Sequence, residues 1–207
     1  MTNLTHVRWI AGGTGAGKST VARILADRLA ATVYDGDRAE RTWIPRCTRE
    51  NHPHMHANLA MTRAQRAMLA PEEKFRAMPS LHGETIGFLV EDLQAMPGPV
   101  LVDWFGVTPR DVAPLLTRPE EAAFLLPTSD FREHALRTRF ADPQRARANW
   151  GDADPAVALA NRLRRDELWD AEIRRQAAET GLPVIDVDGS RTPESIADEL
   201  AANFQSS

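Results

Sequence analysis

The sequence predicts an α/β fold built on a parallel β-sheet. Short apolar segments recur along the chain, and each is followed by a stretch in which apolar residues repeat at helical spacing. A glycine-rich loop at residues 12–19 lies between the first such segment and the first helical stretch. Alternation of strands and helices is typical of parallel sheets. The length of 207 residues suits a single domain of this kind, spanning residues 1–207.

Five segments have the composition of strands, and each ends near a Gly, Asp, Pro or Ser residue. Ligands of parallel sheets bind beyond the carboxyl ends of the strands, so we expect the functional residues in the loops that follow these segments. The five segments are residues 7–11, 31–35, 99–103, 122–126 and 183–187.

A long interval separates the second and third segments, and residues 43–98 are predicted to form a helical insertion. Three helical stretches are expected there, at about residues 57–70, 71–78 and 80–96. Gly83 and Gly87 in the last stretch predict close approach of another backbone or of a ligand. We interpret the insertion as the part that binds the second substrate; a structural cover for the sheet edge explains most of its residues equally well.

Residues 139–155 are predicted to form an irregular lid, because Asp-Pro pairs and an Asn-Trp-Gly sequence are turn signals. A lid that closes over phosphates brings guanidinium groups to the charge that develops on a transferred phosphoryl group. We select Arg132, Arg139 and Arg162 for this role, although a solvated helix surface is the simpler explanation for any single arginine. Helices are expected over residues 156–180 and after Thr192, a residue type that favours the N-cap position.

The composition restricts the partners of the protein. The net charge of −4 and the isoelectric point of about 5.9 disfavour a nucleic-acid partner. The single cysteine, Cys47, forms no internal disulfide and fits a reducing compartment. No apolar run approaches the roughly 20 residues of a membrane span. We therefore expect a cytoplasmic protein without a membrane partner, either a monomer or a homodimer.

The glycine-rich loop predicts the phosphate donor. Residues 12–19 read GGTGAGKS and match G-x-x-x-x-G-K-[ST] at every fixed position. In such a loop the backbone N–H groups and the following helix N-terminus bind phosphate, the lysine reaches the β- and γ-phosphates, and the hydroxyl ligates Mg²⁺. We expect ATP phosphates to bind at Gly13, Thr14, Gly15, Ala16, Gly17, Lys18, Ser19 and Thr20, with Arg139 from the lid.

Carboxylates follow two of the predicted strands. The second ends in Asp35-Gly36-Asp37, and phosphoryl transfer to a hydroxyl needs one group to orient or deprotonate that hydroxyl and another to help hold Mg²⁺. An ordinary Asp-Gly turn is the simpler alternative. The third ends in Asp103, which either binds Mg²⁺, caps the next turn or, if Asp35 already holds the metal water, faces the acceptor.

Polar and aromatic residues near these carboxylates are candidates for acceptor binding. We expect Asp35, Asp37, Arg38, Arg41 and Trp104 to contact the acceptor. A histidine-rich segment at residues 52–56, with Cys47 nearby, has the residue types of a metal cluster, but its spacing matches none of the structural zinc patterns. We therefore interpret the segment as part of the acceptor pocket or of the surface.

Together these residues resemble the P-loop small-molecule kinases, the group of gluconate, shikimate, adenylylsulfate and adenylate kinases. The resemblance rests on GGTGAGKST, on the Asp-Gly-Asp sequence and on the arginine-bearing lid; the segment FLLPTSDFR at 124–132 is similar to one in uncharacterised bacterial kinase-like proteins. It implies a three-layer α/β/α sandwich with a five-stranded parallel sheet in the order 2-3-1-4-5. In the shikimate kinase pattern, Asp35 would hold Mg²⁺ through water and Asp37 would orient the acceptor hydroxyl. The Gly-Gly-Gly sequence of shikimate kinase is absent after the third strand, where this chain has DWFG.

The expected function is therefore that of an ATP- and Mg²⁺-dependent kinase acting on a hydroxyl of a small metabolite or antibiotic. Lys18, Asp37, Arg132 and Arg139 are assigned catalytic roles, and Ser19, Asp35 and Asp103 are assigned to the metal. A nucleoside or nucleotide kinase and a non-catalytic nucleotide-binding regulator are the alternatives, and the acidic balance disfavours a nucleic-acid end kinase. The absence of an Asn/Thr-Lys-x-Asp sequence favours ATP over GTP.

Overall fold

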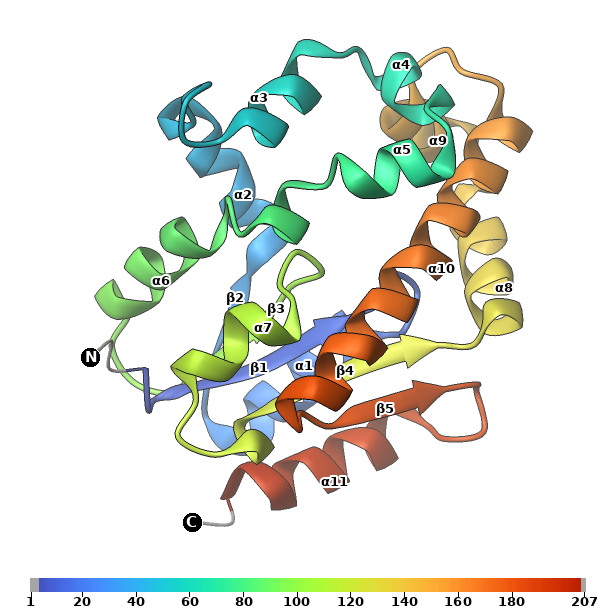
Figure 1. Cartoon of the computed structure of the whole chain (residues 1–207). Helices are drawn as coiled ribbons and strands as arrows, with labels where there is room; N and C mark the ends of the chain where they lie inside the picture. Colours follow the sequence, from blue (N-terminus) through green and yellow to red (C-terminus); the bar gives the residue numbers. More distant parts are fainter. Residues whose placement is uncertain (1–3, 206–207) are drawn as a thin grey trace.

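A five-stranded sheet in which all strands are parallel forms the centre of the molecule (Figure 1). The computed structural model describes residues 4–205. The spatial order of the strands is β2-β3-β1-β4-β5, which confirms the expected order. All five predicted strands are present, at β1 Val7–Gly12, β2 Thr32–Asp35, β3 Val100–Asp103, β4 Ala122–Pro127 and β5 Val184–Val187.

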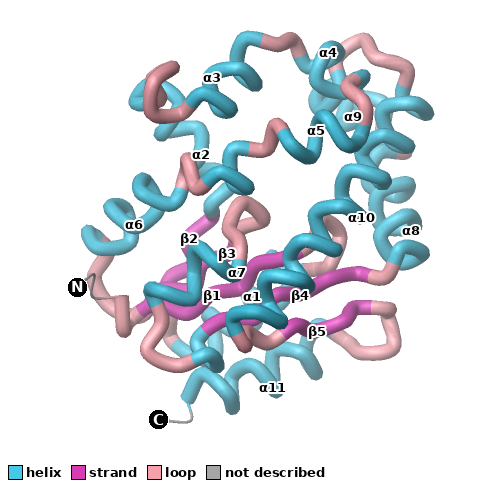
Figure 2. The backbone as a smooth tube through the Cα atoms, viewed as in Figure 1, coloured by secondary structure: helices cyan, strands magenta, loops and turns pink. Residues whose placement is uncertain are grey.

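Helices cover both faces of this sheet, which gives the three layers that the resemblance implied (Figure 2). Alternate residues of each strand point to opposite faces. On one face, β1 and β4 pack against α1 (Lys18–Leu29) and α11 (Pro193–Gln205) through a core that includes Ile10, Leu25 and Leu200. On the other face lie α6 (Ile86–Ala95), α7 (Pro109–Val112) and α10 (Pro155–Thr180), with Trp9 and Trp169 in the core.

The insertion between β2 and β3 is helical, but its helices begin and end elsewhere than expected. The first expected helix is two helices, because Met61 is extended and Thr62 starts a new helix with a capping box to Gln65. The third starts as a 3₁₀ turn that ends at Gly83, whose φ of 66° closes it. The segments are α2 Gly36–Trp43, the 3₁₀ turn Ile44–Arg46, α3 Pro53–Ala60, α4 Arg63–Met68, α5 Pro71–Arg76, the 3₁₀ turn Pro79–His82 and α6.

The prediction of an irregular stretch at 139–155 is wrong. It holds the end of α8 (Ser129–Phe140), all of α9 (Pro143–Trp150) and the start of α10. The two Asp-Pro pairs are helix starts rather than turns, because Asp142 and Asp154 each accept backbone N–H hydrogen bonds and a proline follows at the first helical position. Helix α10 spans the predicted 156–180, and Thr192 caps α11 as expected.

Helix α9 packs on the insertion rather than on the sheet. Ala67 of α4 lies in a small buried cluster with Ala146 and Trp150 of α9 and Ala158 of α10, and Figure 1 shows these helices side by side above the sheet. The remaining 3₁₀ turns are Ala113–Leu115 and Pro119–Glu121. Within residues 4–205, none of the helices combines the length and the apolar character that crossing a bilayer requires.

Candidate active site

Three glycines with a positive φ, Gly12, Gly15 and Gly17, shape the loop between β1 and α1. Gly12 has a φ of 112°, and a Cβ atom there would lie 2.3 Å from the carbonyl oxygen of Leu125 on β4. Gly17, with a φ of 76°, is the N-cap of α1, and no side chain caps that helix. Thr20 and Val21 donate their backbone N–H groups to the carbonyl oxygen of Gly17, so those of Lys18 and Ser19 remain available to an anion.

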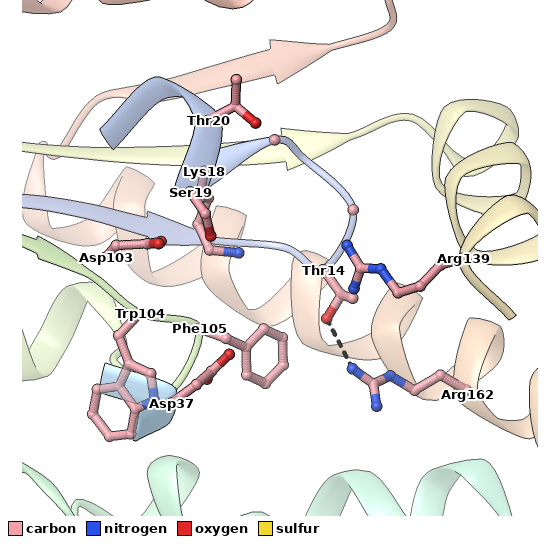
Figure 3. A pocket seen from close by; sticks show the side chains of 12 residues that line it. Thr14, Lys18, Ser19, Thr20, Asp37, Asp103, Trp104, Phe105, Arg139 and Arg162 are labelled. Carbon is pink, nitrogen blue, oxygen red and sulfur yellow. Dashed lines mark hydrogen bonds between the residues drawn. The ribbon is translucent and has the colours of Figure 1, made fainter. Parts of the chain in front are cut away.

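A cavity of about 240 Å³ opens in front of this loop, at the carboxyl ends of the strands (Figure 3). Its walls come from the loop and α1, from α2, from the segment after β3, and from α8 and α10. The cavity contains most of the predicted phosphate-binding residues, whereas Gly13 and Ala16 lie in the loop without lining it. The lining residues are Thr14, Gly15, Gly17, Lys18, Ser19, Thr20, Asp37, Asp103, Trp104, Phe105, Arg139 and Arg162.

Lys18 is held inside the cavity by its own loop. Its Nζ atom donates a hydrogen bond to the carbonyl oxygen of Gly13 at 2.7 Å and lies 5.9 Å from the centroid of the Phe105 ring. Burial lowers the pKa of Lys18, while the charges of Asp103 and Asp37 act to raise it. A phosphate in the cavity would supply the close anion that this buried ammonium group lacks.

Ser19 and Asp103 offer oxygen ligands of the kind that Mg²⁺ prefers. Both line the cavity. Burial raises the pKa of Asp103, and the Ser19 hydroxyl and the Lys18 charge oppose that effect. Within residues 4–205, no three His, Cys, Asp or Glu side chains come together as a metal site. A hydroxyl and one carboxylate fit an ion that takes its other ligands from phosphate oxygens and water.

Only one carboxylate of the Asp-Gly-Asp sequence faces the cavity. Asp37 lines it, whereas Asp35 is the N-cap of α2 and accepts a hydrogen bond from the backbone N–H of Arg38 at 3.0 Å. Asp35 does pair with Asp103 in the β2–β3 register, so it lies close without lining the cavity. Arg38 and Arg41 are carried by α2 and line neither this cavity nor the one described below.

Two arginines line the side of the cavity opposite Asp37 and Asp103 (Figure 3). Arg139 comes from the end of α8 and Arg162 from the second turn of α10. The Nη2 atom of Arg162 donates to the Thr14 hydroxyl at 3.2 Å, and its Nε atom donates to Asp166 at 2.8 Å. Arg162 therefore connects α10 directly to the glycine-rich loop after β1.

Arg132 lies elsewhere than the sequence predicts. Its side chain is 2% exposed, forms an ion pair with Asp170 and does not line the cavity. Its Nε atom donates to the carbonyl oxygen of Thr14 at 3.4 Å. A Cβ atom on Gly13 would lie 2.7 Å from Asp170, so the ion pair packs against the loop. Arg132 is positioned to hold the loop in place rather than to contact a phosphate.

Trp104 shapes the wall between Asp37 and Asp103, and two glycines make room for its ring. A Cβ atom on Gly36 would lie 2.1 Å from Trp104, and one on Gly106 would lie 2.3 Å from it. The ring also packs edge-on against Trp43, which is fully buried and donates to Asp92 at 2.9 Å. The glycine between the two aspartates is therefore required by packing as well as by the turn.

Replacing Gly36 with alanine is expected to destabilise the protein by about 1–3 kcal/mol, because the added methyl group overlaps the buried Trp104 ring. Gly87→Ala is the matched control. Gly87 lies in α6, and a Cβ atom added there would meet no neighbouring residue within 4 Å, so the predicted close approach at Gly87 is wrong. The stability of the Gly87→Ala protein is expected to equal that of the wild type or to rise by up to about 1 kcal/mol. Urea unfolding measures both; equal stability of the two variants would contradict the packing.

A second cavity of about 270 Å³ adjoins the first and shares four of its residues. It lies between α10 and the insertion, with walls from α2, α3, α4, α5 and the segment after β3. Sequence reasoning missed several of its residues, among them Phe105, Glu40, Lys74 and Arg165. The second cavity is lined by Asp37, Glu40, Asn58, Arg66, Leu69, Lys74, Met78, Pro79, Ser80, Trp104, Phe105, Gly106, Arg162 and Arg165.

The histidine segment does not line either cavity. Nδ1 of His54 lies 2.6 Å from a carboxylate oxygen of Glu84, and its ring stacks on His82. His52 stacks on Phe88. These contacts place His52 and His54 in the packing of the insertion.

The sheet order, the flanking helices and the loop before α1 together define the α/β fold of the P-loop kinases. Among solved structures with this fold, a gluconokinase from Sinorhizobium meliloti 1021 superimposes with a TM-score of 0.50 over 96% of this chain and 90% of its own, at 16% sequence identity. No protein-family model matches the chain, and no curated protein matches it by sequence. The likeness concerns the fold.

Proposed function

We propose that the protein is an ATP- and Mg²⁺-dependent kinase that phosphorylates a hydroxyl group of a small metabolite. One observation carries the proposal: Asp37 lines both cavities, and so lies where a phosphate-binding cavity meets a second cavity. A donor phosphate next to Lys18 and an acceptor in the second cavity would meet at this carboxylate. The fold shared with a gluconokinase is consistent with such a reaction.

The proposed reaction transfers one phosphoryl group and one proton. The acceptor hydroxyl oxygen forms a bond to the γ-phosphorus of ATP, the bond between that phosphorus and the β–γ bridging oxygen breaks, and ADP leaves. The hydroxyl proton passes to the Asp37 carboxylate, which acts as general base. Lys18 neutralises phosphate charge, and Arg139 and Arg162 stabilise the charge on the transferred group. Ser19 and Asp103 would hold Mg²⁺, which when bound offsets charge on the phosphate oxygens.

The size of the second cavity favours a small acceptor. Its volume of about 270 Å³ lies at the lower end of the range for ligand pockets, roughly 300–1,000 Å³. The buried cluster of Ala67, Ala146, Trp150 and Ala158 joins α4 of the insertion to α9 and α10, so an acceptor in the second cavity would lie between the insertion and α10. Excluding water from the second cavity would favour phosphoryl transfer to the acceptor over hydrolysis of ATP.

The test is phosphoryl transfer by the purified protein. Incubation with ATP and Mg²⁺ and a panel of hydroxyl compounds, beginning with gluconate and including nucleosides and nucleoside monophosphates, is expected to yield ADP and one phosphorylated product detected by ³¹P NMR. EDTA is expected to abolish product. Binding of ATP without transfer to any compound in the panel or in a cell extract would contradict the proposal and favour a nucleotide-binding regulator.

A further inference from the structure

The second cavity is rich in positive charge. Four cationic side chains line it, from α4, α5 and α10, against two carboxylates, Asp37 and Glu40. Burial and the neighbouring Asp37 raise the pKa of Glu40 to about 7, so this carboxylate is only partly charged at neutral pH. The charge of the cavity is therefore positive in a protein whose net charge is −4. The cations are Arg66, Lys74, Arg162 and Arg165.

Internal partners account for some of these cations. Arg162 and Arg165 both contact Asp166, at 2.8 Å and 2.5 Å, and that aspartate is fully buried. Arg66 donates to the carbonyl oxygens of Asn58 and Met61, at 2.7 Å and 2.5 Å, and so satisfies the end of α3. The single carboxylate of Asp166 cannot neutralise two guanidinium groups, and the carbonyl oxygens leave the charge of Arg66 uncompensated.

Lys74 has no such partner. Among the described residues its ammonium group forms no ion pair and no hydrogen bond, although the residue is half-buried on α5. Burial, together with the like charges of Arg165 and Arg162, lowers the pKa of Lys74 to about 8. The ammonium group therefore lies among like charges, in a position that an anion in the cavity would stabilise.

Arg165 adds an unsatisfied donor to the same wall. The residue is 7% exposed, its guanidinium group lies over the Phe105 ring at 5.3 Å, and its buried Nε atom has no hydrogen-bond partner among the described residues. Buried donors without a partner are uncommon in folded proteins. Asp166 therefore leaves part of the hydrogen-bonding capacity of Arg165 unused, and the guanidinium group adds positive charge to this wall of the cavity.

The distribution of lysine points to the same two cavities. Among the 25 lysine and arginine residues of the chain, only Lys18 and Lys74 are lysines, and each lines one of the adjoining cavities. The compact, strongly hydrated charge of lysine is suited to binding an anionic oxygen, as Lys18 does in the proposed donor site. Lys74 lines the cavity assigned to the acceptor, as Lys18 lines the cavity assigned to the donor.

We propose that the acceptor is itself an anion, a small hydroxyl compound whose carboxylate or phosphate group is bound by Lys74 while its hydroxyl faces Asp37. This proposal rests on the proposed kinase function. Arg162, which lines both cavities, lies between the two anions and interacts with each. Uncharged compounds of the same shape would leave Lys74 without a counter-charge and would bind less tightly.

Chemical labelling of the two lysines tests the anion site without requiring catalysis. The wild-type protein is acetylated with an N-hydroxysuccinimide ester, and the rate at each lysine is followed by peptide mass spectrometry. ATP is expected to slow the acetylation of Lys18. Aldonates of four to six carbons and glucose 6-phosphate are the anionic probes, and the matching alditols and glucose are the uncharged ones. An anionic probe is expected to slow acetylation of Lys74, and its uncharged counterpart is not.

Kinetics of variants test the assignment to the acceptor. Lys74→Met is expected to raise KM for the acceptor by roughly 10- to 100-fold with a smaller effect on kcat and none on KM for ATP, and Lys74→Arg is expected to restore part of the loss. Arg76→Met, an exposed cation on the same helix, is the matched control and is expected to behave as wild type.

The outcomes separate the two proposals. Equal phosphorylation of charged and uncharged acceptors, with KM unchanged in Lys74→Met, would overturn the anionic acceptor and leave the kinase function standing. Protection of Lys74 by anions without transfer to any of them would support the anion site and contradict the kinase function. Protection by aldonates alone indicates a carboxylate, and protection by glucose 6-phosphate alone indicates a phosphate ester.

Discussion

Replacing Lys18 with alanine is expected to reduce phosphoryl transfer by about 10³-fold, with the fold intact. Lys18 is a partly buried cation that lines the cavity, and its ammonium group donates a hydrogen bond to its own loop. Removing it leaves the charge of the β- and γ-phosphates without its main counter-charge, both when ATP binds and when the phosphoryl group moves. Steady-state rates of ADP release with and without acceptor measure the effect.

Two controls accompany this variant. Circular dichroism and urea unfolding are expected to match the wild type, because burying the Lys18 charge itself costs free energy and its removal leaves no opposite charge in a direct ion pair. Arg23→Ala removes an exposed cation from the same helix and is expected to retain activity. Wild-type transfer by a folded Lys18→Ala protein would refute the donor site.

Replacing Asp37 with asparagine is expected to lower kcat by about 10²- to 10⁴-fold while KM for ATP changes little. Asparagine keeps the shape of the side chain but cannot accept the hydroxyl proton. Asp37 lines both cavities, so the loss concerns transfer between them rather than binding of the donor. The measurement is the full dependence of rate on ATP and on acceptor concentration.

Asp35→Asn decides between the two carboxylates of the Asp-Gly-Asp sequence. Asparagine caps helices about as well as aspartate, so α2 is expected to remain intact. Because Asp35 lines neither cavity, its variant is expected to lose far less activity than Asp37→Asn. A larger loss from Asp35→Asn would reverse the roles and return Asp35 to the metal site that the sequence resemblance implied.

The elements that the sequence alone predicts are those formed by short, contiguous stretches of the chain. Three of the five strands, β1, β3 and β4, are largely buried apolar runs, and the glycine-rich loop is a contiguous motif, so both are visible without the rest of the molecule. The body of α10 is also predictable, but the prediction of turns at the Asp-Pro pairs 142–143 and 154–155 is wrong, because the same two residue types occur in turns and at helix starts. Boundaries in the insertion failed because capping at Thr62 interrupts a continuous helical pattern.

Side-chain roles depended on contacts between distant segments. Arg132 follows a strand just as a phosphate-binding arginine would, yet Asp170 on α10 draws it into a buried ion pair. Lys74 belongs to an exposed-looking sequence, PEEKFR, and becomes part of a cavity only because α5 packs on α10 opposite Trp104. The sequence around Arg132 or Lys74 does not show these contacts, because Asp170 and the rest of α10 lie tens of residues away in the chain.

The sequence alone determines the position of a glycine-rich loop between a strand and a helix, and this local order is enough to predict a phosphate site there. The choice between Asp35 and Asp37, the fit of Trp104 between Gly36 and Gly106, and the positive charge of the second cavity come from packing between the insertion, the segment after β3 and α10. Which groups share a cavity is set by how these elements pack, because the lining side chains come from segments that are distant in the sequence.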